Sequence, residues 1–185
     1  MTTTALILID VQRGFDDPRC GTRNNPGAEA NITALLEAWA AAGQPLVLVR
    51  HDSLIADSPL AEGSPGAAFK SELDGARPDL MFTKHVNSAF HGAVDLHAWL
   101  TGRGITRIVL AGIQTNMCVE TTARVGGNLG YQVTVALDAT FTFDLEGPDG
   151  LRLSADELSR ATVVNLHGGG FARVTDTATV LGELG

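Results

Sequence analysis

The chain has 185 residues, a formal net charge of −8, and a composition in which 44% of residues are hydrophobic. This length and apolar content fit one domain with a full core, spanning residues 1–185. The 13 Lys and Arg residues are scattered rather than clustered, which argues against a nucleic-acid-binding face.

The two cysteines, Cys20 and Cys118, are too few for a disulfide framework, and a reducing cytoplasm is the expected setting. The apolar residues 5–9 are too short for a signal peptide, lack a basic leader and end at Asp10. No apolar run approaches the roughly 20 residues of a membrane span, so no membrane partner is expected.

Apolar runs and helical patterns alternate along the chain. Parallel core strands are predicted at residues 5–10, 46–50, 107–113 and 132–137, with weaker candidates at 81–84 and 172–175. Helices are predicted at residues 31–42, 93–100, 115–129 and 154–165, the last opening with a capping box. This alternation predicts βαβ units with right-handed crossovers, and therefore an α/β fold with a doubly wound parallel sheet.

One segment, residues 52–79, is irregular and rich in Pro, Gly and Ser. Loops of this length inside a compact domain are usually functional or mobile. Three interpretations are open: a cap over a site, an oligomer contact, or a plain surface excursion.

Polar side chains end three of the predicted strands. Asp10 ends the first strand, Lys84 ends the weak strand at 81–84, and Cys118 follows the strand at 107–113. Ligands of open α/β sheets bind beyond the carboxyl ends of the strands, so these three groups are expected at one edge of the sheet.

Cys118 is predicted to lie in the first turn of a helix, where backbone N–H groups and the helix dipole stabilise an anion. That placement predicts a thiol that ionises more easily than a free one. The alternative is a small buried core residue, which is the commoner fate of an intracellular cysteine.

The three groups make chemical sense together. A carboxylate such as Asp10 can take a thiol proton and later deliver it to a leaving amine. A nearby Lys84 favours both the thiolate and the ionised carboxylate. Each residue also has a simpler interpretation: Asp10 as a turn cap, Lys84 as a solvated side chain, or the two as a structural ion pair.

The chain resembles the isochorismatase-like cysteine hydrolases in three separated motifs, which occur in order over nearly its whole length. The motifs are Asp10-Val11-Gln12 with Phe15, Lys84 with Ser88-Ala89-Phe90, and Gly112-Ile113-Gln114-Thr115-Asn116-Met117-Cys118-Val119 with Thr122 and Arg124.

This resemblance implies a Rossmann-like αβα sandwich around a six-stranded parallel sheet of order 3-2-1-4-5-6, and a homo-oligomer. It implies a catalytic triad of Asp10, Lys84 and Cys118. It also implies a cis peptide before Gln114 and an oxyanion hole at Gln114 and Cys118. In the implied sheet order the third strand lies two positions from the first, so Lys84 must reach inward.

The pocket residues expected around this triad are Gln12, Phe15 and Phe90. Nicotinamidase-type relatives carry a metal set that resembles Asp-x-His with a further His, but here His51 precedes Asp52 and no histidine follows until His85. No catalytic metal and no cofactor are therefore expected.

The histidines offer two further possibilities, a metal site and a pocket-lining residue, and neither has a specific motif. The histidines at 85, 91 and 97 are spread over a loop and a helix start, without a fourth clustered ligand. His51 is either a hydrogen-bonded strand-end residue or part of the pocket lining.

The leading hypothesis is a hydrolase that cleaves a C–N bond of a small amide-like substrate through a thioester on Cys118. True isochorismatases cleave a vinyl ether and resemble this fold, but they typically lack the nucleophilic cysteine. The alternatives are such a vinyl-ether hydrolase, or a non-catalytic or redox-sensing protein with Cys118 as its sensing thiol.

Overall fold

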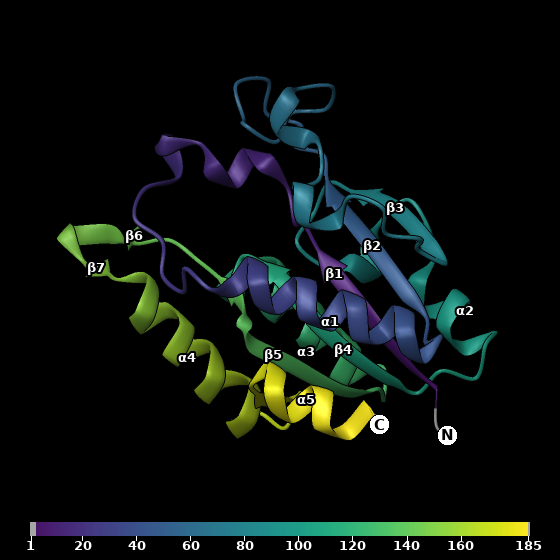
Figure 1. Ribbon diagram of the computed structural model, residues 1–185. Coiled ribbons are helices and arrows are strands. Elements are labelled where there is room, and N and C mark those ends of the chain that lie inside the picture. The colour runs from purple at the N-terminus through teal and green to yellow at the C-terminus, as the bar shows by residue number, and fades with distance from the viewer. Residues whose placement is uncertain (1–2, 185) are drawn as a thin grey trace.

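Six parallel strands form the central sheet of the computed structural model, which describes residues 3–184 (Figure 1). The strands are β1 (Thr4–Ile9), β2 (Leu46–His51), β3 (Leu80–Lys84), β4 (Arg107–Ile113), β5 (Gln132–Phe141) and β8 (Arg173–Thr175). Their order is β3-β2-β1-β4-β5-β8, which confirms the expected topology because β8 is the sixth strand of this sheet. The order reverses between β1 and β4, where sheets of this kind bind ligands.

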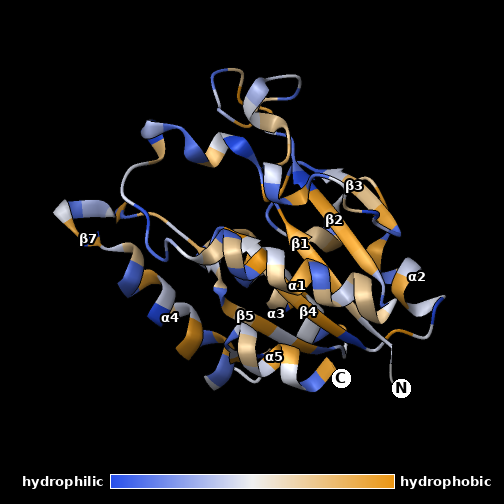
Figure 2. Ribbon diagram, in the orientation of Figure 1, coloured by the Kyte–Doolittle hydropathy of each residue, from blue (hydrophilic) through white to orange (hydrophobic). Residues whose placement is uncertain are grey.

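Helices cover both faces of the sheet, giving three layers (Figure 1). On one face lie α1 (Ala28–Ala42) and α5 (Thr177–Leu184), and on the other α2 (Leu96–Thr101), α3 (Glu120–Asn128) and α4 (Ala155–Gly168). Side chains of β1 alternate between the two cores, with Leu6 and Leu8 against α1 and Ile7 and Ile9 on the opposite face. Figure 2 shows the resulting hydrophobic centre of the sheet.

Several elements differ from the predicted ones. The predicted helix at 115–129 is a π-helical turn, Thr115–Val119, followed by α3. Three of the helices and strands have no predicted counterpart: α5, and the strands β6 (Leu145–Glu146) and β7 (Arg152–Leu153), which form a short hairpin. The capping box of α4 is confirmed, because Ser154 and Glu157 bond each other's main-chain N–H groups.

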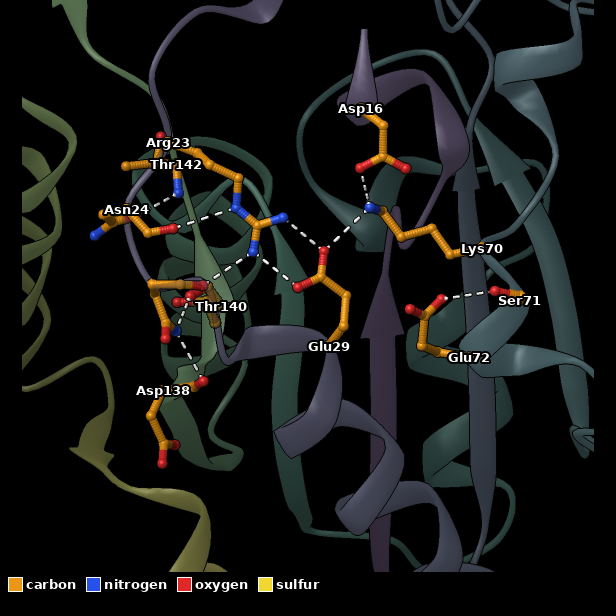
Figure 3. A network of polar contacts seen from close by, with 11 residues as sticks. Asp16, Arg23, Asn24, Glu29, Lys70, Ser71, Glu72, Asp138, Thr140 and Thr142 are labelled. Carbon is orange, nitrogen blue, oxygen red and sulfur yellow. Dashed lines mark hydrogen bonds and ion pairs between the residues drawn. The ribbon is translucent and has the colours of Figure 1, made fainter.

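The irregular segment 52–79 is anchored to the body of the protein near its end. Lys70 is only 5% exposed and forms ion pairs with Glu29, on the first turn of α1, and with Asp16 (Figure 3). Burial alone would raise the pKa of Glu29, but hydrogen bonds from Arg23 and Lys70 lower it to about 2. The carboxylate therefore stays ionised, and the ion pairs hold this part of the segment against α1.

The other end of the segment projects beyond the carboxyl ends of β1 and β2 (Figure 1). There Leu54 and Ile55 are 80% and 72% exposed. Within residues 3–184, no helix combines the length and apolarity needed to cross a bilayer.

Candidate active site

Asp10, Lys84 and Cys118 meet at the carboxyl edge of the sheet. Lys84 Nζ donates to Asp10 Oδ2 at 2.6 Å and to Cys118 Sγ at 3.4 Å. Lys84 reaches past β2 to do so, because β2 lies between β3 and β1. The four-carbon side chain thus spans the gap that the sheet order imposes.

The backbone conformation after β1 and β4 directs the side chains of Asp10 and Cys118 into the site. Asp10 has φ 53°, in the left-handed region that Asp and Asn tolerate better than most residues, immediately after β1. Cys118 lies in the π-helical turn after β4, where the Met117 and Val119 N–H groups both donate to the Gln114 carbonyl. Such π turns often occur at functional sites.

The peptide between Ile113 and Gln114 is cis, as the family resemblance implies. Gly112, which precedes Ile113, has φ 122°, and a Cβ atom there would collide with the carbonyl oxygen of Ile9. Only glycine therefore fits between β1 and β4 at the entrance to the Cys118 turn.

The three groups are almost completely shielded from water: Asp10 is 0% exposed, Lys84 1% and Cys118 8%. Burial raises the pKa of Asp10 despite the opposing charge of Lys84. Burial, together with the negative charge of Asp10, raises the pKa of the Cys118 thiol to about 12, although Lys84 opposes this. The expectation of an easily ionised thiol is therefore wrong for this closed site, because desolvation and the Asp10 charge outweigh the effect of Lys84.

Asp10 has one free carboxylate oxygen. Oδ1 is buried and has no hydrogen-bond partner among residues 3–184, while Oδ2 binds Lys84. A carboxylate oxygen of Asp10 and the Sγ atom of Cys118 lie within 4.8 Å of each other. The carboxylate can therefore accept a proton from the thiol after a small movement.

Gln12 does not line this site in the expected way. Its side chain is fully buried, donates to the carbonyls of His51 at 2.9 Å and Ala67 at 3.0 Å, and accepts from the His51 N–H at 2.8 Å. The expectation of a substrate contact is corrected, because these main-chain bonds use the polar atoms of Gln12.

Phe90 is also misplaced by the sequence prediction. Its ring stacks on Tyr131 with centroids 5.7 Å apart. Tyr131 directly precedes β5, at the amino edge of the sheet, whereas the site lies at the carboxyl edge. Phe90 is therefore a partly buried residue that packs against the core, away from the site. Phe15 packs in a cluster with Ile113, beside the Cys118 turn, so its pocket role stays a prediction.

Two further residues lie near the thiol: His51, for which the sequence leaves a strand-end or a pocket-lining role open, and Asn87, which has no predicted role. His51 Nδ1 lies 3.4 Å from Lys84 Nζ, and Asn87 Oδ1 lies 3.9 Å from Cys118 Sγ. The signal for His51 was its place at the end of β2, opposite Lys84 in the parallel register. For Asn87, the one feature of the sequence that could have indicated a place in the site is its position three residues after Lys84.

The metal set of nicotinamidase-type relatives does not fit these residues. Asp52 is 2% exposed, and both of its carboxylate oxygens accept hydrogen bonds from Arg50 at 2.9 Å. A second donor group exists, since Asp10, His51 and Cys118 offer ligand atoms within 4.8 Å of one another. The Lys84 ammonium contacts all three, so it already supplies the positive charge at that point.

Comparison with known proteins gives a consistent assignment. A family model described as "Isochorismatase domain" matches residues 4–177. The isochorismatase family protein YrdC of Bacillus subtilis is 35% identical over 163 residues, covering 88% of this chain and 87% of its own. The ureidoacrylate amidohydrolase RutB of Methylobacterium radiotolerans is 34% identical over 219 residues, covering 99% of this chain and 80% of its own.

A solved structure agrees with the sequence matches. The crystal structure of an isochorismatase-family hydrolase from Chromobacterium violaceum superposes with a TM-score of 0.92 and 42% sequence identity. It covers 98% of this chain and 93% of its own. Fold and sequence thus both point to one group of proteins.

Proposed function

The chain belongs to the isochorismatase family, and from this premise we propose that it is a cysteine-dependent hydrolase of small amide-like substrates. One observation carries the proposal. The ammonium of Lys84, at the end of β3, contacts both the Asp10 carboxylate, which follows β1, and the Cys118 thiol, which follows β4. A base, a cation and a nucleophile in mutual contact match the requirements of covalent acyl transfer.

The first half of the reaction forms a thioester. Asp10 takes the Cys118 proton as Sγ attacks the substrate carbonyl carbon. The developing oxyanion is stabilised by the backbone N–H groups of Gln114 and Cys118. The C–N bond then breaks, and the leaving nitrogen receives the proton from Asp10.

The second half returns the enzyme to its starting state. Water attacks the thioester carbon and gives a proton to Asp10. The C–S bond breaks, the acid leaves, and Sγ recovers its proton. Lys84 retains its charge throughout and lies beside whichever partner is negative, the carboxylate or the thiolate.

The raised pKa values support proton transfer during attack rather than a preformed thiolate. With a pKa of about 12, the Cys118 thiol keeps its proton in the resting enzyme. Burial raises the pKa of Asp10 as well, which makes it a stronger base in this site. The proton therefore moves when the oxyanion begins to form.

Two observations support the proposed substrate class: the burial of the Cys118 thiol and the similarity of the chain to an amidohydrolase. A thiol that is 8% exposed admits a compact carbonyl group rather than a polypeptide. The similar RutB is an amidohydrolase, which favours C–N over vinyl-ether cleavage. We include in this proposal a pocket wall at Phe15, a homo-oligomeric single-domain enzyme, and chemistry without metal or cofactor.

The test is ammonia or amine release from a panel of small amides and ureides. We expect turnover that survives chelation and is abolished by iodoacetamide, in both the natural protein and a Cys20→Ser variant. The variant assigns alkylation to Cys118, because the chain has two cysteines. Turnover of a vinyl ether but no amide, or full activity after complete alkylation, would overturn the proposal.

A further inference from the structure

His51 and Lys84 are opposite each other in the parallel β2–β3 register. His51 Nδ1 lies 3.4 Å from Lys84 Nζ. An ammonium group has three N–H donors and no acceptor. Three acceptors surround Nζ: Asp10 Oδ2 at 2.6 Å, Cys118 Sγ at 3.4 Å and His51 Nδ1 at 3.4 Å. The imidazole thus completes the coordination of the ammonium.

This contact fixes the state of the imidazole. Nδ1 can accept from Lys84 only if its lone pair is free, so the neutral ring carries its hydrogen on Nε2. Burial, followed by the charge of Lys84, lowers the pKa of His51 to about 4, although Asp52 opposes the shift. Asp10, Cys118, Lys84 and the nearby His85 are the other titratable groups around the ring. The ring therefore remains an acceptor at neutral pH.

Gln12 fixes the backbone that carries this ring. Its amide oxygen accepts from the His51 N–H at 2.8 Å, and its amide nitrogen donates to the His51 carbonyl at 2.9 Å. The third bond of the Gln12 amide, to Ala67 at 3.0 Å, ties the same point to the segment 52–79. Gln12 is fully buried, so water does not compete for these bonds.

We propose that His51 is a positioning residue that holds the Lys84 ammonium against the Cys118 thiol, and that Gln12 fixes His51 for this task. The inference rests on the proposed roles of Lys84 and Cys118. Asp10 attracts the ammonium more strongly than a neutral thiol does, because it is charged and 0.8 Å closer (3.4 Å against 2.6 Å). The His51 acceptor directs the third N–H of Lys84 and limits rotation of the ammonium toward Asp10.

Loss of the acceptor should leave the forming thiolate with a less well placed cation, and thiolate formation should become harder. His51→Asn retains an acceptor near the position of Nδ1, whereas His51→Gln places its amide near Nε2 and His51→Leu has no acceptor. The three variants thus separate hydrogen bonding at Nδ1 from simple filling of space. Thermal unfolding of each variant establishes that it is folded.

The readout is the rate of iodoacetamide alkylation at Cys118 at pH 9, in a Cys20→Ser background, followed by peptide mass. We expect His51→Gln and His51→Leu to react about tenfold more slowly, as for a rise of one pKa unit, and His51→Asn within about threefold of the parent. Equal slowing by Asn and Gln, or a parental rate in Leu, would overturn the proposal. If Leu fails to fold, the Asn–Gln pair decides. No substrate is used, so the result is independent of the proposed amide hydrolysis.

Discussion

Removing the Lys84 charge tests the buried ion pair most sharply. Both side chains of the Asp10–Lys84 pair are 0% exposed and their charged atoms lie 2.6 Å apart. At an effective dielectric constant of about 20, the attraction is about 6 kcal/mol, part of which offsets the loss of hydration of both ions. Lys84→Met leaves Asp10 buried without its cation, and we expect the free energy of unfolding to fall by about 3–5 kcal/mol at pH 8.

The matched control is Asp10→Asn combined with Lys84→Met, which removes both charges. Asn tolerates the left-handed backbone at position 10, so most of the lost stability should return. In Lys84→Met, burial raises the folded-state pKa of Asp10 above its unfolded value. The folded state then binds the proton more tightly, so the defect should shrink from pH 8 to pH 5. Urea unfolding that shows equal stability for the single and double variants, or a defect independent of pH, would refute this reasoning.

Three further results are expected. Gly112→Ala should lower the free energy of unfolding by about 3 kcal/mol or more, because the new Cβ atom collides with the main chain of β1. Gly168→Ala on α4 should change it little, because a Cβ atom there meets no other atom within 4 Å. The midpoints of urea unfolding check both variants. Glu120→Ala should cost about 1–3 kcal/mol by the same assay, because the buried carboxylate accepts from Thr162 at 2.6 Å and ties α3 to α4. Alkylation of Cys118 should accelerate about tenfold per pH unit from about pH 7 to 10, since its pKa is raised to about 12, and a plateau below about pH 9 would contradict this.

The central strands were readable from sequence because their signals are local. Arg107–Ile113 has the predicted bounds, since its apolar run is buried on both faces and ends at the Cys118 turn. The β5 strand continues beyond the predicted end because Thr140 and Phe141 pair again with Gly112 and Ile113 after a register shift. That pairing depends on residues about 28 positions away (141 − 113 in the register), which no local pattern contains.

In the candidate site, too, local signals could be read from the sequence and long-range contacts could not. Strand ends placed Asp10, Lys84 and Cys118 together, because parallel strands present their carboxyl ends at one edge. The thiol pKa depends on how completely the site is closed, which follows from packing. The role of Gln12 was misassigned because its partners, His51 and Ala67, come from distant segments.

The α5 helix, Thr177–Leu184, was missed although a signal exists. Asp176 accepts from the Thr179 N–H at 2.8 Å, which is an N-cap pattern readable in the sequence. The segment has eight residues, which is too short for apolar periodicity to be recognised reliably. Its helix is stabilised by tertiary packing, because Val180 is buried in the core cluster and α5 contacts α1 and β5.

The rate of amine release by Cys118→Ala, with Cys20→Ala as the matched control, tests the central claim most directly. Cys118 contacts the Lys84 ammonium, whereas Cys20 Sγ donates to the Gly14 carbonyl. With any amide that the natural protein hydrolyses well, we expect Cys118→Ala to lose at least about 10³-fold in kcat and Cys20→Ala to retain its activity. Undiminished amine release by Cys118→Ala would contradict the covalent mechanism.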